Sequence, residues 1–557
     1  ILRKQTCKQH STMAGEEHPL RIAIIGAGVS GLVCAKTLVA SNLRAEAEVH
    51  LIDCENHVGG RVATDRREDG YLIDRGFQIL IRSYPEIQKQ LDLKALELQS
   101  FGQGAVLVYG KEQHVFANPL TCPWYILRTI RVIFIKWGLL GTILDICKLA
   151  SRVIVPGWLG YFSNPYEALR KRWGLNVVEK LSKGGDVGHG DAGDSNDTTA
   201  APVNNPKTTK EFLENRVGLT SGFYREFLDP FFEAIYVSPL AAQNPGMFEF
   251  VLRMLAVPGS PVLPKGGIQA IPDQLLQQIY EKLKADRTSS SMKFRLRLNE
   301  TVGNVESDVH TKGVVEVIVN GKKERFDQVV IATEWLRALE IVKRKGKPSN
   351  SIATSSETWY FSLPEHALPV REPLIALNVM DKSTSSSNAG SGSQSALSAP
   401  LLDDSSSRSI SSCSDIYRIS NIGFPSVIQR SYAPKGYHLC AVTVMQKSVP
   451  SQGSWQKRWP QEEIFTTWIR NELSKLFPET DFSTWKFLDR KCIDFHQPSQ
   501  APDVLEDLLN DAKSESESMK SDSILYCGDW KGTPTLDGAM LTGRLAAEKA
   551  IRILQAS

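Results

Sequence analysis

One short segment limits the possible folds more than any other part of this chain: the pattern GAGVSG at positions 26–31. It follows the apolar run 21–25, which predicts a buried parallel strand, and it opens residues 29–40, which predict a helix. The first glycine permits a tight turn, the second lets the backbone approach a pyrophosphate, and the third lets the helix pack close to the sheet. The N–H groups of the helix N-terminus attract the anion. The residues assigned to this site are Gly26, Gly28, Val29, Ser30 and Gly31.

A second strand and a second glycine loop follow at the spacing of a dinucleotide site. Residues 49–52 predict the strand, and Asp53 closes it, about 20 residues beyond the glycines, where an acid binds ribose hydroxyls. Gly59, Gly60 and Arg61 add a further loop that can approach a phosphate, with a fixed cation beside it. A simple NAD site does not need this second loop.

These segments, together with the C-terminus, resemble a known superfamily. The run GAGVSGL…LIDCENHVGGRVAT…GYLIDRGFQIL and the C-terminal ILYCGDWKGTPTLDGAMLTGRLAAEKAI are similar to the FAD-dependent amine oxidases and phytoene desaturases. So are LPKGGIQAIPDQL at 263–275 and LRLNETVGNVE at 296–306, in the same order. The resemblance covers nearly the whole chain. It is specific for the superfamily and much less so for a substrate.

The resemblance implies an α/β fold, in which a discontinuous Rossmann-like FAD-binding domain of the glutathione-reductase type carries an inserted α+β substrate domain. It implies that the backbone of Val302 holds the adenine and that Asp529 binds the ribityl hydroxyls. It also implies that the last helix begins at Asp537 beneath the isoalloxazine, where the positive end of the helix favours negative charge on the reduced ring. The other residues assigned to the FAD site are Gly76, Phe77, Gln78, Gly528, Gly538 and Ala539.

No catalytic side chain is assigned, because the cofactor performs the hard chemical step and the protein positions the substrate. The ten histidines are dispersed without metal-ligand spacing, so no metal site is expected.

Further local patterns complete the expected FAD-binding domain. Residues 314–319, the turn Asn320-Gly321 and residues 326–333 predict a hairpin leading into a buried strand. Residues 523–527 predict a strand and residues 538–554 a long helix. The chain has 557 residues, too many for one simple domain at roughly 150 residues each.

The expected boundaries follow from this order of segments. Three stretches are poor in apolar residues and are expected to be disordered inserts. The assigned segments are an N-terminal extension at 1–20; the FAD-binding domain at 21–100, 265–345 and 490–557; the substrate domain at 101–264 and 346–489; and inserts at 183–207, 383–414 and 503–521.

The region 119–161 is the most apolar part of the chain. Arg131, Lys136, Asp145 and Lys148 interrupt it, so it contains no run of about 18 uncharged apolar residues that could cross a bilayer. It predicts one or two helices whose apolar faces line a cavity, pack in a core or rest on a bilayer surface. A peripheral membrane contact is therefore one expected partner interaction.

One position just before the last helix bears on the class of substrate. The resemblance implies that amine oxidases place an aromatic wall of their amine cage where this chain has Thr535. A cation needs aromatic faces or carboxylates to leave water, so the missing wall weakens the amine hypothesis. Lys265 is a candidate for the flavin-facing lysine of those enzymes, although an exposed turn lysine explains it as well.

Three hypotheses on function follow. The favoured one is an FAD-dependent oxidoreductase acting on a small hydrophobic substrate, a carotenoid or other isoprenoid, by desaturation or isomerisation. The second is oxidation of an amine or of a protoporphyrinogen on the same fold. The third is a non-enzymatic escort protein that binds lipid or prenyl groups.

Composition narrows partners and compartment only a little. Lys and Arg total 65 and Asp and Glu 62, a net charge of +3 that gives no reason to expect nucleic acid. Nine cysteines without a CxxC pair fit a reducing compartment. Residues 1–15 are basic and free of acids, so they belong either to a transit peptide of a plastid or other organelle, or to an extension before Met13 of a cytoplasmic protein. The oligomeric state stays open.

Overall fold

The architecture comes from a computed structural model of the chain. It describes residues 19–41, 43, 46–155, 166, 169, 173, 206–259, 261–285, 292–307, 314–343, 353–379, 413–414, 416–446, 462–500 and 523–556. The expected extension at 1–20 and the expected inserts at 183–207, 383–414 and 503–521 lie outside these residues, apart from a few at their ends.

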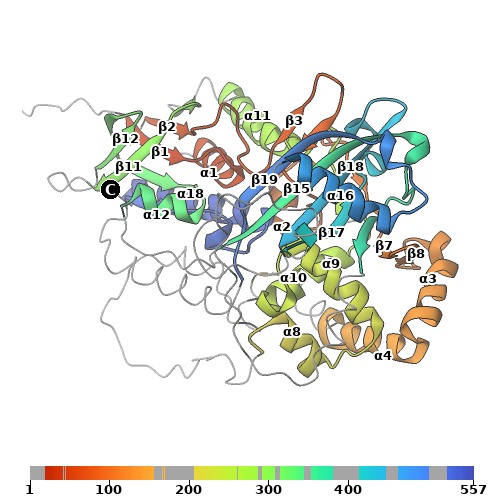
Figure 1. Cartoon of the computed structure of the whole chain (residues 1–557). Coiled ribbons are helices and arrows are strands. Elements are labelled where there is room, and N and C mark those ends of the chain that lie inside the picture. Colours follow the sequence, from red (N-terminus) through yellow and green to blue (C-terminus); the bar gives the residue numbers. More distant parts are fainter. Residues whose placement is uncertain are drawn as a thin grey trace, which may run out of the picture.

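A parallel sheet of five strands brings together segments from three distant parts of the chain (Figure 1). Its strands pair in the order β10-β2-β1-β14-β20, and every pairing is parallel. Such a sheet is covered on both faces, which explains why its strands are continuous apolar runs. The bounds are β10 Met292–Arg297, β2 Ala47–Ile52, β1 Leu20–Ile25, β14 Gln328–Ile331 and β20 Ile524–Tyr526.

Alternate residues of the central strand β1 face different layers. Ile22 and Ile24 pack in a core with three helices, whereas Ala23 and Ile25 pack against a small antiparallel sheet on the other face. The helices are α1 Val29–Val39, α11 Ala270–Ala285 and α18 Leu536–Ala556; the small sheet consists of β11 Val302–Ser307, β12 Val315–Val319 and β13 Lys322–Phe326, with α12 Trp335–Ile341 beside it.

The predicted hairpin is present, with one difference at its second arm. Asn320 and Gly321 both have positive φ angles, +47° and +78°, as a tight two-residue hairpin turn requires. The returning arm is β13, and the buried strand β14 follows after it in the parallel sheet. The predicted strand at 523–527 and the helix at 538–554 correspond to β20 and α18.

The substrate domain is built on a mixed sheet of seven strands, with order β19-β15-β18-β17-β16-β7-β8. All pairings are antiparallel except that between β16 and β7. The strands are β7 Gly104–Tyr109, β8 Glu112–Ala117, β15 Ala353–Pro364, β16 Ile375–Asn378, β17 Tyr417–Gly423, β18 Tyr437–Gln446 and β19 Lys486–Pro498.

Strand β19 corrects one expected boundary. It pairs with β15 as far as Pro498, so the third segment of the FAD-binding domain begins after residue 498 and not at 490. The sequence pattern did not predict the full length of β19, because it contains charged residues. An edge strand with one exposed face lacks the continuous apolar run by which buried strands are recognised.

Short strands and helices join the two sheets and cover them. Figure 1 shows α9 and α10 below the seven-stranded sheet and α16 against it. The joining strands are β3 Thr64–Arg66, β4 Leu72–Asp74, β5 Leu80–Ile81, β6 Gln99–Ser100 and β9 Pro261–Leu263; the helices are α2 Pro85–Gln90, α8 Thr209–Glu211, α9 Asp229–Tyr236, α10 Pro245–Ala256, α15 Pro425–Ile428 and α16 Glu462–Leu476.

The predicted helices of the apolar region form a broken helical arm, defined here as residues 123–154. Its elements are η1 Pro123–Tyr125, α3 Ile126–Val132, η2 Ile133–Trp137, α4 Leu139–Leu149 and η3 Ala150–Ile154. Among the described residues, the helices are too short or too polar to traverse a bilayer.

One buried carboxyl group ties the two domains together. Asp74, at the end of β4, accepts hydrogen bonds from the Thr64 hydroxyl (2.5 Å), the Ile268 N–H (3.1 Å) and the Tyr432 hydroxyl (2.9 Å). The Tyr360 hydroxyl of β15 also donates to the Asp74 carbonyl, at 2.9 Å. Burial raises the pKa of Asp74 to about 6. The donors come from both domains, so this group fixes their relative position.

The packing of α18 on α1 gives a first testable prediction. A Cβ atom at Gly543 would lie well under 3.0 Å from the Ser30 carbonyl oxygen, and backbone cannot yield easily. Gly543→Ala is therefore expected to lower the free energy of unfolding by about 1–3 kcal/mol, despite the better helix propensity of alanine. Gly303→Ala is the matched control, because nothing lies within 4 Å of a Cβ there. Urea unfolding that ranks the two variants equally would contradict the close packing.

Candidate functional site

The two glycine loops predicted from the sequence lie against each other. Gly28 and Gly59 form a parallel bridge, and the Gly59 N–H donates to the Ala27 carbonyl at 2.9 Å. Gly59 has a φ of +119° and a Cβ there would collide with the Val62 carbonyl oxygen, so glycine is required at this position of the crossing. A Cβ at Gly28 would meet only the Gly59 carbonyl, at 3.9 Å. The protein itself therefore leaves free space in front of Gly28.

Glycine at the other two positions of the first loop is required by the fold. Gly26 has a φ of +109°, and a Cβ there would lie 2.9 Å from the Ala332 carbonyl oxygen. A Cβ at Gly31 would collide with the Gly26 carbonyl and touch the Ala332 side chain of the sheet. These two glycines therefore set how closely α1 approaches the sheet, while Gly28 faces open space.

Asp53 lies at the carboxyl end of β2, next to the glycine turn that follows β1. Its carboxylate accepts hydrogen bonds from the Ala27 N–H at 2.6 Å and from the Glu55 N–H at 2.9 Å. Adjacent parallel strands end at the same edge of the sheet, and that topology brings the acid to the turn. Asp53 remains half-buried, so part of its carboxylate surface stays accessible to a ligand.

The C-terminal motif meets the N-terminal one along this edge. The Ser30 hydroxyl donates to the Ala539 carbonyl at 2.5 Å, across 509 positions of sequence. Arg61 of the second glycine loop donates to the Asp529 carboxylate at 2.9 Å. The Gly528 N–H, in turn, donates to the Thr542 hydroxyl at 3.0 Å. Both ends of the chain thus contribute to a single site.

Asp537 lies inside the protein, with its carboxylate directed toward α2. One oxygen accepts the Glu86 N–H at 2.7 Å and the Ile87 N–H at 3.2 Å, and the other accepts the Tyr166 hydroxyl. It therefore binds N–H groups at the start of α2 that have no partner within the helix. Burial raises the pKa of Asp537 to about 6 although these hydrogen bonds favour the charged form.

The start of α18 is capped by Thr535. Its hydroxyl accepts the Gly538 N–H at 3.0 Å and shares a further hydrogen bond with the Thr533 hydroxyl at 2.9 Å. A Cβ at Gly538 would collide with the Thr533 backbone, so glycine is required there by packing. The sequence placed Thr535 in the substrate site, and the structure shows that its side chain also has a structural task.

Gly76, Phe77 and Gln78 lie between the two domains. The Gln78 side-chain amide donates to the carbonyls of Arg61 and Arg75, each at 2.7 Å, so it braces the second glycine loop. Phe77 packs against Phe101, with ring centroids 6.4 Å apart. Gln78 therefore acts on the site by holding the loop of Arg61. Phe77 packs against the substrate domain.

Val302 begins β11 on the opposite side of the parallel sheet from α1. Its carbonyl accepts a hydrogen bond from Arg337 at 2.8 Å, and its side chain is buried. The backbone predicted to hold an adenine therefore already has one partner at its carbonyl oxygen, which can accept a second hydrogen bond.

His496, which no sequence pattern indicated, lies beside the Arg61–Asp529 pair. Its carbonyl accepts a hydrogen bond from Arg61 at 2.9 Å, and its ring Nδ1 bonds to the Ser356 hydroxyl at 2.5 Å. Burial and the neighbouring Arg61 lower the pKa of His496 to about 4. The ring is therefore neutral at pH 7. Only its position in the segment that returns to the FAD-binding domain could have indicated it.

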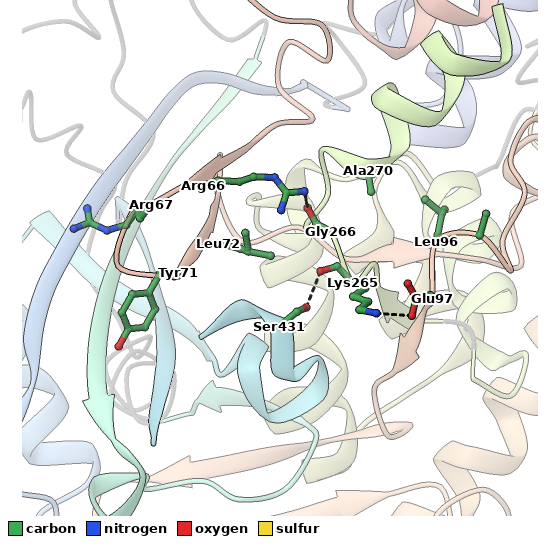
Figure 2. A pocket seen from close by; sticks show the side chains of 12 residues that line it. Arg66, Arg67, Tyr71, Leu72, Leu96, Glu97, Lys265, Gly266, Ala270 and Ser431 are labelled. Atoms are coloured by element: carbon green, nitrogen blue, oxygen red, sulfur yellow. Dashed lines mark hydrogen bonds and ion pairs between the residues drawn. The ribbon is translucent and has the colours of Figure 1, made fainter. Parts of the chain in front are cut away.

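A separate recess of about 610 Å³ opens on the surface between β3, β4 and the turn before α11. Figure 2 shows Lys265 there, 2.7 Å from the Glu97 carboxylate, and the Ser431 hydroxyl donating to the Lys265 carbonyl. None of the residues assigned to the FAD site lines this recess. Lys265 is thus an exposed, paired lysine outside that site.

The residues present fit FAD. Two glycine loops leave space for a pyrophosphate, and Arg61 supplies a cation next to them. Asp53 and Asp529 would accept hydrogen bonds from the ribose and ribityl hydroxyls. Residues Gly26 to Gly31 would hold the pyrophosphate, and the start of α18 would lie beside the ring. Within the described residues, no group of metal-binding side chains is found.

Asp537 gives a prediction on pH dependence. Its pKa is higher in the folded protein than in the unfolded chain, so its contribution to stability is fully present at low pH and is lost as pH rises from about 4 to about 6. Asp537→Asn keeps an acceptor but cannot ionise. Between pH 4 and pH 7, the free energy of unfolding of the variant should rise by on the order of 2 kcal/mol relative to that of wild type. Urea unfolding of the flavin-loaded proteins measures both values. A difference between them that does not change with pH would contradict the burial of Asp537.

Gly28 gives a prediction that separates binding from folding. Gly28→Val should yield folded protein without flavin absorbance, because the added methyl groups fill space that only the nucleotide needs. Gly31→Val should instead lose the fold, since its side chain would collide with the Gly26 backbone. Circular dichroism and the flavin absorbance of the purified proteins distinguish these outcomes. A folded, yellow Gly28→Val protein would show that the pyrophosphate lies elsewhere.

Comparisons with known proteins agree with this geometry. A putative protoporphyrinogen oxidase from Exiguobacterium sp. 255-15 has a TM-score of 0.57 and 12% identity, over 96% of this chain and 99% of that one. A CLA-producing fatty acid isomerase from P. acnes has a TM-score of 0.56 and 12% identity, over 94% and 97%. A reduced UDP-galactopyranose mutase has a TM-score of 0.51 and 13% identity, over 96% of both chains. At such identities these structures share the fold.

The family is established by sequence. The family described as flavin containing amine oxidoreductase matches residues 29–551, nearly the whole chain. This confirms the resemblance stated from the motifs, the α/β fold and FAD as cofactor. The roles of the individual site residues stay predictions. The chain belongs to the flavin-containing amine oxidoreductase family and is an FAD-dependent oxidoreductase.

Proposed function

We propose that this oxidoreductase acts on a small hydrophobic substrate, a carotenoid or another isoprenoid, by desaturation or isomerisation. The proposal rests on one observation: the polar side chains at the start of α18, where the resemblance places the isoalloxazine ring, are already hydrogen-bonded within the protein. Thr535 caps the helix through its hydroxyl, and the Asp537 carboxylate is fully engaged with α2 and Tyr166.

At position 535, an amine substrate would find neither an aromatic wall nor a carboxylate. A desolvated ammonium group needs aromatic faces or a free carboxylate. Thr535 offers neither, and Asp537 has no oxygen without a donor. Lys265, the candidate for the flavin-facing lysine, lies in the separate surface recess. An apolar polyene needs none of these groups.

The side chains next to Asp537 are aromatic and buried. Tyr84 and Phe250 stack with ring centroids 5.5 Å apart, and Tyr166 packs against Phe250 at 6.1 Å. These rings are packed in the protein core and add no charged group to this place. The fatty acid isomerase shares this fold, which supports an apolar substrate at the level of fold alone.

The chain's own residues have defined tasks in such a reaction. When bound, FAD would supply a hydride acceptor; in a desaturation oxygen or a quinone would take up the electrons, whereas in an isomerisation the hydride would return to the substrate. The N-terminus of α18 would favour negative charge on a flavin ring held beside it. Arg61 and Asp529 hold each other at the pyrophosphate end, and Asp74 keeps the two domains in register. The family membership favours an enzyme over the non-enzymatic escort hypothesis.

The proposal is tested by mixing the yellow protein, without oxygen, with a panel of carotenes and other isoprenoids. Desaturation should bleach the flavin absorbance with at least one polyene, and isomerisation should change the polyene's chromatographic retention without net bleaching. Polyamines and a protoporphyrinogen serve as comparison substrates.

The amine hypothesis makes an additional prediction. Placing an aromatic side chain at the missing wall, Thr535→Tyr, removes the cap of α18 and should cost about 1 kcal/mol of stability without creating amine oxidation. Hydrogen peroxide release with polyamines by the wild type, together with no effect on any polyene, would overturn the proposal.

A further inference from the structure

The helical arm carries most of the exposed apolar side chains found in the described part of the chain. Sixteen large hydrophobic residues are exposed there, and thirteen of them lie between positions 120 and 155. Leu120, Leu127 and Leu140 are 90%, 77% and 73% exposed. The remaining members are Trp124, Ile126, Ile130, Phe134, Ile135, Leu139, Ile143, Leu144, Ile146 and Val155. Single exposed apolar residues are common, but such a concentration marks an interaction surface.

The inner face of the arm is firmly attached to the substrate domain. Trp137 donates to the Glu226 carboxylate at 2.9 Å, and the Thr129 hydroxyl accepts the Ala117 N–H of β8 at 3.0 Å. The Asp145 carboxylate accepts the N–H groups of Thr220 and Ser221, at 2.9 and 2.7 Å. Packing within the protein thus fixes the arm with its apolar side outward. Figure 1 shows α3 and α4, in orange, at the far end of the molecule from the parallel sheet.

The dimensions of the arm suit the surface of a bilayer. Helix α4 has 11 residues and is about 16 Å long, roughly half the thickness of a hydrocarbon core of about 30 Å. It can therefore lie in the plane of the interface, with its apolar side in the acyl region. Trp124 and Tyr125 stand at the beginning of the arm, and such rings favour the headgroup level.

The charges of the helical arm indicate which kind of partner it binds. Between positions 119 and 155 the cations are Arg128, Arg131, Lys136, Lys148 and Arg152, and the only acid is Asp145, which is buried. Arg128 pairs with Glu372, Lys136 with Glu112 and Lys148 with Asp145, so five cations face three acids and the arm keeps a positive surplus. Arg131 is exposed and makes no ion pair within the described part of the chain. A second copy of the chain, packed on this face by two-fold symmetry, would bring like charges together. An anionic bilayer brings opposite charges.

We propose that the helical arm docks the protein on the surface of a membrane that contains anionic lipids, with Leu127 and Leu140 inserted among the acyl chains and Trp124 at the headgroup level. The inference does not depend on the identity of the substrate. It adds a reason for an apolar one, because a polyene or isoprenoid dissolved in the bilayer would be next to the enzyme.

The test measures binding of the flavin-loaded, full-length protein to vesicles of phosphatidylcholine with and without phosphatidylglycerol, by flotation. Wild type should float with the anionic vesicles. Leu127→Asp combined with Leu140→Asp should lower the partition coefficient tenfold or more, because two leucines no longer leave water. Arg131→Gln should lower it about fivefold on anionic vesicles only. Tyr280→Ser is the control, an exposed apolar residue on α11 that should have no effect.

Two readouts keep the test independent of folding and of catalysis. Flavin absorbance and circular dichroism should be unchanged in all variants, since the altered side chains are exposed. The fluorescence difference between wild type and Trp124→Phe should shift to shorter wavelength when vesicles are added. Equal flotation of wild type and the double leucine variant would overturn the proposal. So would a wild-type dimer in solution that the double variant converts to a monomer without loss of vesicle binding.

Discussion

The rest of the site depends on the close packing of the last helix, α18, against the glycine turn. Because Gly543 has no side chain, α18 approaches the Ser30 backbone, and the Ser30 hydroxyl can donate to the Ala539 carbonyl. This contact sets β20 and α18 against the same sheet as β1 and α1. A ligand lying along the strand ends is consequently held by residues from both ends of the chain. Neither glycine motif alone defines that site, since the glycine loops and helix α18 are about 500 positions apart in sequence and meet only through the fold.

Much of the fold was predictable from local patterns, because buried parallel strands are continuous apolar runs and glycines mark the turns between them. Strands β1, β2 and β20 and helices α1 and α18 follow their patterns closely. The strand order was not predictable from the residues alone. Strand β14 lies between β1 and β20, and that neighbourhood is set by long-range packing. The boundary at 490 was wrong because β19 is a partly exposed edge strand, whose charged side chains conceal it.

The site shows where sequence reasoning reaches its limit. The pattern assigned Asp537 and Gln78 to the FAD site, but the direction of each side chain depends on partners far away in sequence. Asp537 binds the start of α2, about 450 positions earlier, and Gln78 braces the loop of Arg61. His496 carried no local signal, since its neighbour Arg61 comes from the second glycine loop, far away in sequence. A motif identifies the residue type a site needs, whereas tertiary contacts decide which atoms face the ligand.

The anchoring of Asp74 has a consequence for how ligands enter and leave. Its carboxyl group receives donors from β3, from the turn before α11 and from Tyr432 of the substrate domain, all in a buried position. A hinge motion that separated the domains would break the hydrogen bonds that Tyr432 and Tyr360 donate to Asp74, at a cost of about 1 kcal/mol each, while Thr64 and Ile268 would still donate to its carboxyl group. Separation of the domains carries this cost in addition to that of their other contacts. Local movements of the helices that cover the seven-stranded sheet break neither bond, so we expect ligands to enter and leave through them.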